Sequence, residues 1–273
     1  MASFLVNGLP ARSVDACDRG LMYGDGVFRT LAVKAGRALN VSRHFRLLAH
    51  DCFRLGLPCP SQSLLAEEIR RAAPGDAVVK VIVTRGSSGR GYGYGEDIEP
   101  TRIVAAWPAS APAPEAARDG VRVRRCSLAL AIQPRLAGVK SLNRLESVLA
   151  RAEWRDPAVR EGLLADQEGR LVEGTMSNVF FVSRGALVTP ELSRCGVSGS
   201  QRERVLDLAR ADGISCVVRD AAFGELGEAT EVFLTNSLIG IWPVASMDEL
   251  RWSPGPVARR LQRLIEADDA SAP

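Results

Sequence analysis

The chain has 273 residues, of which 46% are hydrophobic and 25% are charged, and its formal net charge is only +3. This composition is typical of a soluble globular protein and excludes the disordered and fibrous classes. The arginines form nothing denser than pairs and no aromatic residues interleave with them, so the sequence does not indicate a nucleic-acid-binding surface.

In the first part of the chain, apolar residues follow patterns typical of short strands and amphipathic helices. The segment Lys34-Ala-Gly-Arg37 has the composition of a hairpin turn, and a glycine-rich segment at 85–95 follows the last predicted strand. We expect strands at 4–6, 27–33 and 78–84, and helices at 42–55 and 64–72.

The clearest linker is the segment WPASAPAPEAARDG at 107–120, where three prolines and several alanines interrupt every periodic pattern. It divides the chain into two similar parts. We therefore predict an N-terminal α/β domain over 1–107, an interdomain linker over 108–120 and a C-terminal domain over 121–273.

The second part again mixes short strands with helices. A helix at 141–155 is expected to bury an apolar face formed by Leu142, Leu145, Val148, Leu149 and Ala152. Because no regular βαβ repeat is present, the pattern predicts an α+β protein of two domains. The strands are expected at 121–130, 162–165, 179–182, 186–189, 231–235 and 239–244, and two further helices at 201–211 and 257–267.

Six cysteines without a CxxC pair, and a first segment without the basic and long apolar parts of a secretory leader, predict reduced thiols in a cytoplasmic protein. The two histidines, His44 and His50, are too few for most metal sites, so we expect no metal. The longest late uncharged stretch, 232–247, is interrupted by polar residues and a proline, and we expect no membrane span.

The basic residues are almost all arginines, and a bias toward arginine codons is the simplest explanation. The three lysines are Lys34, Lys80 and Lys140. Arginine cannot form a Schiff base or act as a base near neutral pH, whereas lysine can do both. Lys34 lies in a turn, and Lys80 in an apolar strand that aims it outward or toward a partner. Lys140 follows a short apolar stretch directly before a predicted helix, where partial burial would favour its neutral, nucleophilic form.

A second candidate feature is the glycine-rich turn at 196–200, which leads directly into a predicted helix. The first N–H groups of a helix and its dipole favour an anion such as a phosphate. The alternative is an ordinary capped helix. The loop Thr235-Asn-Ser237 between two predicted strands has a similar alternative, an ordinary hairpin.

Four segments resemble, in order, the motifs of the class IV aminotransferase family, the pyridoxal-phosphate enzymes of fold type IV. The resemblance covers nearly the whole chain. It implies the two-domain architecture of the D-amino-acid and branched-chain aminotransferases, pyridoxal 5'-phosphate as cofactor, and a homodimer. The four segments are DRGLMYGDGVFRT (18–30), VTRGSSGRGYGYG (83–95), LAGVKSLNRLESVLARAE (136–153) and EGTMSNVFFV (173–182).

The resemblance assigns roles to individual residues of this chain. Lys140 would bind the cofactor as an imine and, once displaced by the substrate amine, would act as the general base. Glu173 would face the pyridine nitrogen and hold its proton, which makes the ring an electron sink. Ser200, Gln201 and Ser237 match the positions that contact the cofactor phosphate.

The arginine that would pair with the phosphate departs from the family pattern. The family spacing is a histidine, two residues and then Arg-Leu, whereas this chain has His44-Phe45-Arg46-Leu47, one residue shorter. We expect Arg46 to bind the phosphate and keep Arg43, about one turn away, as the alternative.

Within the family, RGSSGRGY together with LAGVKSLNRLE is most similar to the lyases of folate biosynthesis that convert 4-amino-4-deoxychorismate to 4-aminobenzoate and pyruvate. This similarity implies substrate contacts from Arg90, Arg29 and Tyr92, because guanidinium groups bind carboxylates in paired fashion. The alternatives are a D- or branched-chain amino-acid aminotransferase and a non-catalytic binding protein of the same fold. The presence of Lys140 and Glu173 argues against the non-catalytic alternative.

Overall fold

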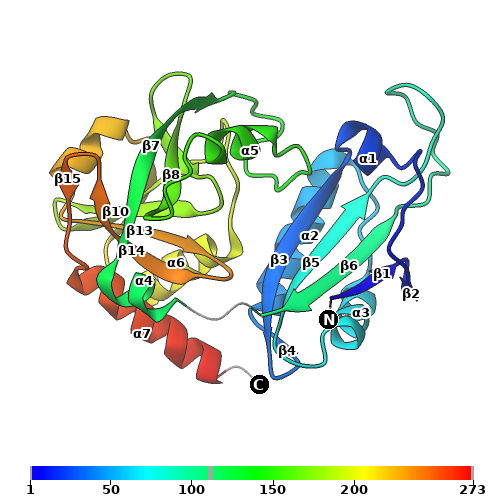
Figure 1. The fold of residues 1–273 in the computed structure, drawn as a ribbon, viewed down its shortest axis with the longest axis horizontal. Helices are drawn as coiled ribbons and strands as arrows, with labels where there is room; N and C mark the ends of the chain where they lie inside the picture. Colours follow the sequence, from blue (N-terminus) through cyan, green and yellow to red (C-terminus); the bar gives the residue numbers. More distant parts are fainter. Residues whose placement is uncertain (1, 110–112, 272–273) are drawn as a thin grey trace. The chain divides into compact units, whose positions relative to one another are not determined.

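A computed structural model describes residues 2–109 and 113–271, and the chain divides into two compact units (Figure 1). Unit 1 consists of Met1–Ala111 together with Val139–Asn143, and unit 2 of Pro112–Gly138 together with Arg144–Pro273. The mixture of helices and strands is that of the predicted α+β class. The short segment around Lys140 thus groups with unit 1, although the predicted C-terminal domain includes it. The predicted domain limits stay a prediction.

The predicted linker is partly helical. Residues 110–112 lie outside the described residues, but Pro114–Asp119 forms the helix α4, on which Ala116 is buried. Proline is tolerated in the first turn of a helix, where its missing N–H would have no intrahelical partner. Pro114 therefore begins a helix at a place where the prolines suggested irregular chain.

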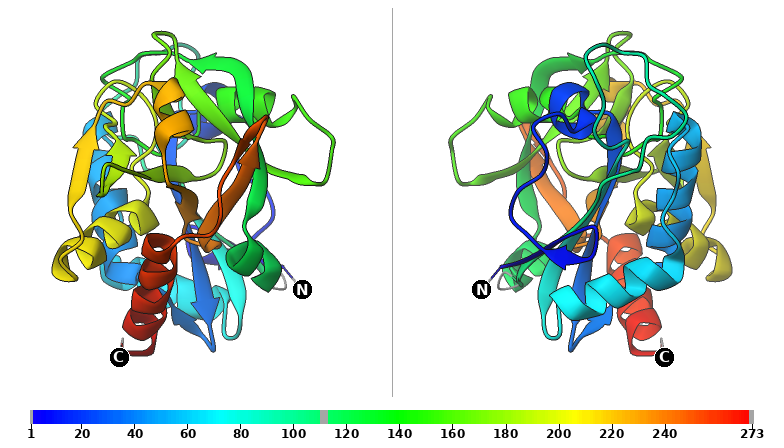
Figure 2. Two further views of the ribbon diagram at one scale, coloured as in Figure 1. Left: turned by 90° about the vertical axis from the view of Figure 1, so that its left-hand side faces the viewer. Right: turned by 90° about the vertical axis from the view of Figure 1, so that its right-hand side faces the viewer.

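Unit 1 is an antiparallel sheet of six strands in the order β2-β1-β6-β5-β3-β4, with helices α2 and α3 on one face (Figure 2). Alternate residues of β3, such as Val27 and Leu31, pack against these helices, as the period of two along a strand requires. The strands are β1 Ser3–Val6, β2 Leu9–Pro10, β3 Gly26–Lys34, β4 Arg37–Ala38, β5 Ala77–Thr84 and β6 Arg102–Pro108, and the helices are α1 Arg19–Tyr23, α2 Val41–Leu55 and α3 Gln62–Ala72.

Unit 2 is a mixed sheet in the order β12-β11-β10-β13-β14-β7-β8-β9, with β15 paired to β14. Phe180 and Phe233 stack at 5.1 Å in the core beneath helices α6 and α7. Among the described residues, no helix is long and apolar enough to cross a membrane. The strands are β7 Val121–Leu130, β8 Val159–Asp166, β9 Leu171–Gly174, β10 Asn178–Ser183, β11 Ala186–Pro190, β12 Cys216–Arg219, β13 Glu231–Asn236, β14 Gly240–Met247 and β15 Leu250–Arg251, and the helices are α5 Leu145–Arg151, α6 Ser200–Ala211, α7 Pro256–Ser271 and the 3-10 helix η1 Phe223–Glu228.

The predicted helix at 141–155 is wrong in its extent and in its buried face. Helix α5 begins only at Leu145, because residues 141–142 instead pair with β3 through a bridge to Val27 and a bond from the Leu142 N–H to the Gly26 carbonyl. Leu145, Val148 and Leu149, which the pattern placed in the core, are 74%, 59% and 59% exposed. Helical spacing alone therefore did not identify the face that is buried.

Two phenylalanines on α2 test the assignment of its inner face. Phe45 is 7% exposed and contributes to the core of unit 1, whereas Phe53 is 81% exposed. We expect Phe45→Ala to lower the free energy of unfolding by about 3–5 kcal/mol, and Phe53→Ala to change it by less than about 0.5 kcal/mol. Denaturant titration of both variants measures the difference. Equal losses would contradict the orientation of the helix.

Candidate active site

The backbone of Lys140 is fixed by strand β3 of unit 1. The Phe28 N–H donates to the Lys140 carbonyl at 2.9 Å, and the Leu142 N–H donates to the Gly26 carbonyl at 2.9 Å. The Asn143 side-chain amide adds a bond of 3.2 Å to the Gly24 carbonyl. These bonds pair the backbone of residues 140–142 with the first half of β3. Strand β4 pairs only with the last two residues of β3, Val33 and Lys34.

The Lys140 amine lies beside an aromatic ring that it shares with a second lysine. The Lys140 Nζ is 4.7 Å from the centroid of the Phe28 ring, and the Lys80 Nζ is 4.3 Å from the same centroid. Lys80 pairs with Thr30 across β5 and β3, so Lys80, Thr30 and Phe28 share the sheet face opposite α2 and α3. Partial burial lowers the pKa of Lys80. Two of the three lysines thus meet at Phe28.

Arg29, the next residue of β3, points to the helix side of the sheet and forms a buried ion pair with Asp51 of α2. The distance from the Arg29 Nη2 to the Asp51 Oδ2 is 2.5 Å, and the two residues are 2% and 0% exposed. The same Asp51 oxygen accepts a long bond of 3.4 Å from the Lys140 backbone N–H. Burial raises the pKa of the Asp51 carboxyl, and the charge of Arg29 opposes that shift. The predicted contact of Arg29 with substrate stays a prediction.

His44 is a buried, neutral group within this cluster of charges. Burial, followed by the positive charges of Arg29, Lys140 and Arg43, lowers the pKa of His44 to about 3. Its imidazole therefore carries no charge near neutral pH. The surrounding cations give this part of unit 1 a positive potential that favours an anion.

The two arginines considered for the phosphate differ in exposure. Arg46 is exposed on the outer side of α2, whereas Arg43 is half-buried and close enough to His44 to affect its pKa. Which of the two binds a phosphate stays a prediction.

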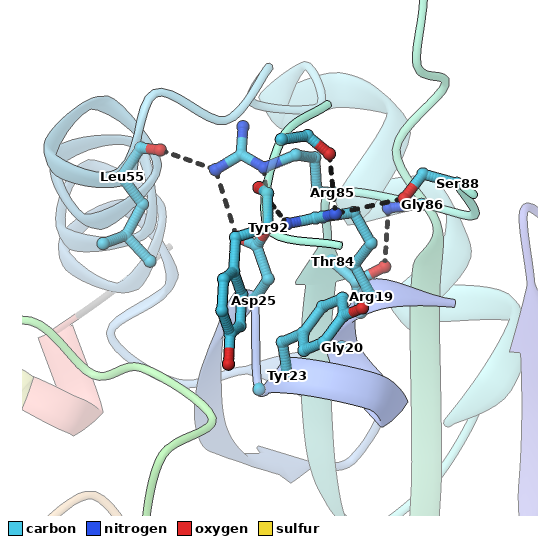
Figure 3. A network of polar contacts seen from close by, with 12 residues as sticks. Arg19, Gly20, Tyr23, Asp25, Leu55, Thr84, Arg85, Gly86, Ser88 and Tyr92 are labelled. Atoms are coloured by element: carbon cyan, nitrogen blue, oxygen red, sulfur yellow. Dashed lines mark hydrogen bonds and ion pairs between the residues drawn. The ribbon is translucent and has the colours of Figure 1, made fainter. Parts of the chain in front are cut away.

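Arg90 and Tyr92 lie in the glycine-rich loop after β5, and both are exposed, Tyr92 by 85%. The backbone of this loop accepts hydrogen bonds from Arg19 (Figure 3). Arg19 also donates to Asp25, which in turn accepts a bond from Arg85. Sequence reasoning assigned no role to Arg19 or Asp25. The available signal was their presence in the segment DRGLMYGDGVFRT, which carries part of the family resemblance.

In unit 2, Glu173 lies on the short strand β9 and is buried, with 5% of its surface exposed. Its Oε2 accepts a hydrogen bond of 2.8 Å from the Val197 N–H. That bond joins the carboxylate to the turn that precedes helix α6. The sequence pattern did not indicate strand β9, whose four residues are too few to show a clear period.

Ser200 and Ser237 come together at the first turn of α6. Their hydroxyl oxygens are 2.8 Å apart, and Ser200 and Gln201 are buried. The residue before the helix is Gly199, which has no side chain that could cap the first N–H groups. Two hydroxyls at a helix N-terminus form an arrangement that suits a phosphate.

Two buried polar residues shape the turns around this site. The Asn178 amide donates to the Val197 carbonyl at 2.9 Å, and a Cβ at Gly199 would lie 2.2 Å from the Asn178 Oδ1, so a larger residue there would displace the Asn178 side chain. Glu161, which is 1% exposed, accepts bonds from the Thr175 hydroxyl at 2.5 Å and the Ser177 hydroxyl at 2.8 Å. Glu161 was missed because one acid in an apolar strand carries no local signal of its partners.

By their chemical types, the donors found within each unit suit pyridoxal phosphate. Lys140 supplies a primary amine, Glu173 a buried carboxylate, and the N-terminus of α6 with Ser200 and Ser237 an anion site. Over the described ranges, no three His, Cys, Asp or Glu side chains form a group that could hold a metal ion.

Comparisons with known proteins agree on one family. The model of the amino-transferase class IV family matches residues 26–247. The chain is 32% identical to an aminodeoxychorismate lyase of Vibrio harveyi over 95% of this chain and 98% of that protein. It is 45% identical to the solved 4-amino-4-deoxychorismate lyase of Pseudomonas aeruginosa, with a TM-score of 0.93 and 97% and 98% of the two chains covered. The PLP-bound form of a hypothetical aminotransferase from Mycobacterium tuberculosis shares the fold at 24% identity and a TM-score of 0.83, with 99% of each chain covered.

The buried ion pair next to Lys140 can be tested by removing one partner or both. Asp51→Asn leaves the Arg29 charge buried without its carboxylate, and we expect it to lower the free energy of unfolding by about 3–5 kcal/mol. The double variant Arg29→Met/Asp51→Leu removes both charges and should recover most of that loss.

Asp156→Asn, in a pair whose side chains are about half exposed, is the matched control and should have little effect. Thermal and denaturant unfolding measure all three variants. A double variant that is as unstable as Asp51→Asn would contradict the assignment of the loss to an uncompensated charge.

Proposed function

Because the chain belongs to the class IV aminotransferase family, we propose that it is a pyridoxal-phosphate-dependent lyase that converts 4-amino-4-deoxychorismate to 4-aminobenzoate and pyruvate. The observation that carries this proposal is the 45% identity, over nearly the full length of both chains, to a solved enzyme with that name. The reactive amine proposed for the chemistry is that of Lys140, which strand β3 holds in place.

Each proposed cofactor contact involves a residue described above. The bound cofactor supplies an electron sink for the pair of electrons released at the carbon next to its imine. Lys140 would hold the cofactor through its amine, and the Glu173 carboxylate would hold the proton on the pyridine nitrogen. Ser200, Gln201 and Ser237 bind the phosphate with the N–H groups of the first turn of α6.

For the phosphate guanidinium, the sequence prediction was Arg46 with Arg43 as the alternative. The half-burial of Arg43 beside His44 favours Arg43, because a buried guanidinium binds an anion with less competition from water. Arg46 would have to bring its exposed side chain inward.

In the proposed reaction, Lys140 would act as the general base, and its free amine would remove the proton from ring carbon 4 of the substrate. The bond between ring carbon 3 and the enolpyruvyl oxygen then breaks, and the ring becomes aromatic, which drives the step forward. Lys140 returns the proton to the departing three-carbon group, which leaves as pyruvate. One side chain thus serves as base and as acid.

The substrate carries two carboxylates, and we assign them to cations of unit 1. Arg90 on the glycine-rich loop is the main contact, with the Tyr92 hydroxyl as a further contact. The sequence prediction also named Arg29, but its buried ion pair with Asp51 lies on the sheet face opposite Phe28, which disfavours that contact. Lys80 adds an ammonium group beside the same Phe28 ring as Lys140. We also propose that the protein is cytoplasmic, in keeping with its six free cysteines. The homodimer that we propose is supported by the family resemblance alone.

An aminotransferase acting on D- or branched-chain amino acids is the second candidate, because the matching family is named for that reaction. It would exchange the amino group with a keto acid and would release no pyruvate from aminodeoxychorismate. A binding protein without catalysis is disfavoured by the buried Glu173 and by the fixed position of Lys140.

The lyase is tested by supplying 4-amino-4-deoxychorismate and measuring pyruvate and 4-aminobenzoate. We expect both products in equal amounts from the wild-type protein. Lys140→Arg keeps a positive charge but has no nucleophilic amine, so activity should fall by at least about 10²–10⁴-fold, the range for loss of a general base.

Lys34 is the exposed last residue of β3, paired with Arg37, and not part of the turn where the sequence prediction placed it. Lys34→Arg is the matched control and should keep full activity. Neither product from wild-type protein, together with clear transamination of an amino acid, would replace the lyase with the second candidate. Full activity of Lys140→Arg would overturn the role of Lys140.

A further inference from the structure

The glycine-rich loop that carries Arg90 needs contacts with other parts of the protein to adopt a single conformation. Glycines occupy positions 86, 89, 91, 93 and 95, and glycine loses more conformational entropy on ordering than any other residue. Arg90 itself is exposed. Its guanidinium can meet a carboxylate in a defined geometry only if the rest of the loop is fixed.

Arg19 of helix α1 supplies bonds to this loop from a buried position, with 3% of its surface exposed. Its Nη1 donates to the Ser88 hydroxyl at 3.1 Å and to the carbonyls of Gly91 at 3.0 Å and Gly93 at 3.3 Å. Its Nη2 donates to the Tyr92 carbonyl at 2.9 Å. Figure 3 shows the Arg19 side chain between α1 and the loop. One side chain therefore bonds to residues on both sides of Arg90.

Arg19 is itself held by a shared carboxylate. Its Nε donates to the Asp25 Oδ2 at 2.9 Å, and the Arg85 Nε donates to the same oxygen at 2.8 Å. Burial alone would raise the pKa of Asp25, but the bonds and charges of Arg85 and Arg19 outweigh it and lower the pKa. Arg85 also donates to the carbonyls of Leu55 at 2.8 Å and Gly56 at 2.9 Å, which ties the network to the end of α2.

Tyr23 completes the hold on the loop. The Arg19 guanidinium lies 4.9 Å from the centroid of the Tyr23 ring, and the Tyr23 hydroxyl accepts a bond of 3.1 Å from the Gly91 N–H. The rings of Tyr23 and Tyr92 are 5.4 Å apart. The backbone of the loop next to Arg90 is thus bonded through both a carbonyl and an N–H.

We propose that Arg19 is a positioning residue whose guanidinium, anchored by Asp25, holds residues 88–93 so that Arg90 is presented to a carboxylate of the substrate. Lysine cannot replace it, because an ammonium group has three donors on a flexible stem, whereas the planar guanidinium has five donors in a fixed fork. The hold on the loop follows from the contacts alone, and only the identity of the substrate rests on the proposed function.

The first test is limited trypsin digestion, since trypsin cleaves after Arg90 when the loop opens. We expect Arg19→Lys to be cleaved there at least about tenfold faster than wild type, because several hydrogen bonds that oppose opening are lost. Arg71→Lys is the matched control. Arg71 also donates to a backbone carbonyl, that of Gly8, but it does not belong to the network of Arg19, Asp25 and Arg85. Its variant should be cleaved after Arg90 at the wild-type rate.

Tyr23→Phe keeps the fold and Arg19 and removes one acceptor only, so it should accelerate cleavage less than Arg19→Lys does. It also keeps the test decisive if Arg19→Lys fails to fold. If Arg19→Lys folds and is cleaved at the wild-type rate, the proposal that Arg19 fixes the loop is wrong. If Arg19→Lys does not fold, cleavage of Tyr23→Phe at the wild-type rate has the same meaning. Because digestion needs no substrate, this result stands or falls independently of the lyase reaction.

The second test separates presentation of Arg90 from mere stability. With aminodeoxychorismate as substrate, Arg19→Lys should raise KM about tenfold while kcat and the affinity for pyridoxal phosphate change less than about twofold. Arg90→Gln should raise KM too, and adding Arg19→Lys to it should raise KM little further, because both act on one contact. Additive effects, or an opened loop with an unchanged KM, would overturn the presentation role. Absence of lyase activity in the wild-type protein would instead contradict the proposed function.

Discussion

The arrangement of the first half of the candidate site depends on the backbone pairing between Lys140 and strand β3. Two bonds of 2.9 Å between main-chain groups place this short segment beside Phe28 and Gly26. Main-chain bonds do not depend on side-chain rotamers, so the attachment point of the lysine side chain is fixed more firmly than a loop would allow. The alternation of β3 then determines what surrounds it. Phe28 faces the lysine amines on one side of the sheet, and Arg29 faces helix α2 on the other.

Positive charge in this region exceeds negative charge, and burial decides which groups carry it. Asp51 forms an ion pair with Arg29, and His44 is neutral because burial and three neighbouring cations lower its pKa to about 3. The remaining cations, with Lys80 beside Phe28, favour anionic ligands. Unit 2 reaches a similar preference by other means, through the N-terminus of α6 and the hydroxyls of Ser200 and Ser237. The carboxylates and phosphate of the proposed reactants match both preferences.

The sequence predicted the regular elements where the pattern is local. The strand at 27–33 and the helix at 42–55 agree with β3 and α2 to within a residue at each end. The helix at 141–155 failed at its start because residues 141–142 pair with β3, more than a hundred positions earlier, and periodicity carries no information about so distant a partner. The prolines of the linker predicted irregular chain, but a proline is compatible with the first turn of a helix, and Pro114 begins α4.

For the candidate site, single-residue chemistry and motif resemblance predicted Lys140, Glu173 and Ser200, and these roles stay predictions. They could not identify residues that act through others. Asp51 and Glu161 are acids inside apolar elements, and Arg19 is one of 32 arginines in the chain. Their importance appears only through partners far away in the sequence, such as the loop carbonyls of Gly91 and Tyr92 for Arg19. Such residues become visible only when the fold brings their partners together.

The scarcity of lysine makes the central claim, that Lys140 is the residue that binds the cofactor, directly measurable. Borohydride reduction of the yellow protein would fix the phosphopyridoxyl group on the amine that bound it, and mass spectrometry of the tryptic peptides would locate it. We expect the label within the peptide 136–144, which is uncut at Lys140 because the modified side chain is no longer a trypsin site. A label on Lys34, on Lys80 or on the N-terminus, with 136–144 unmodified, would contradict the account.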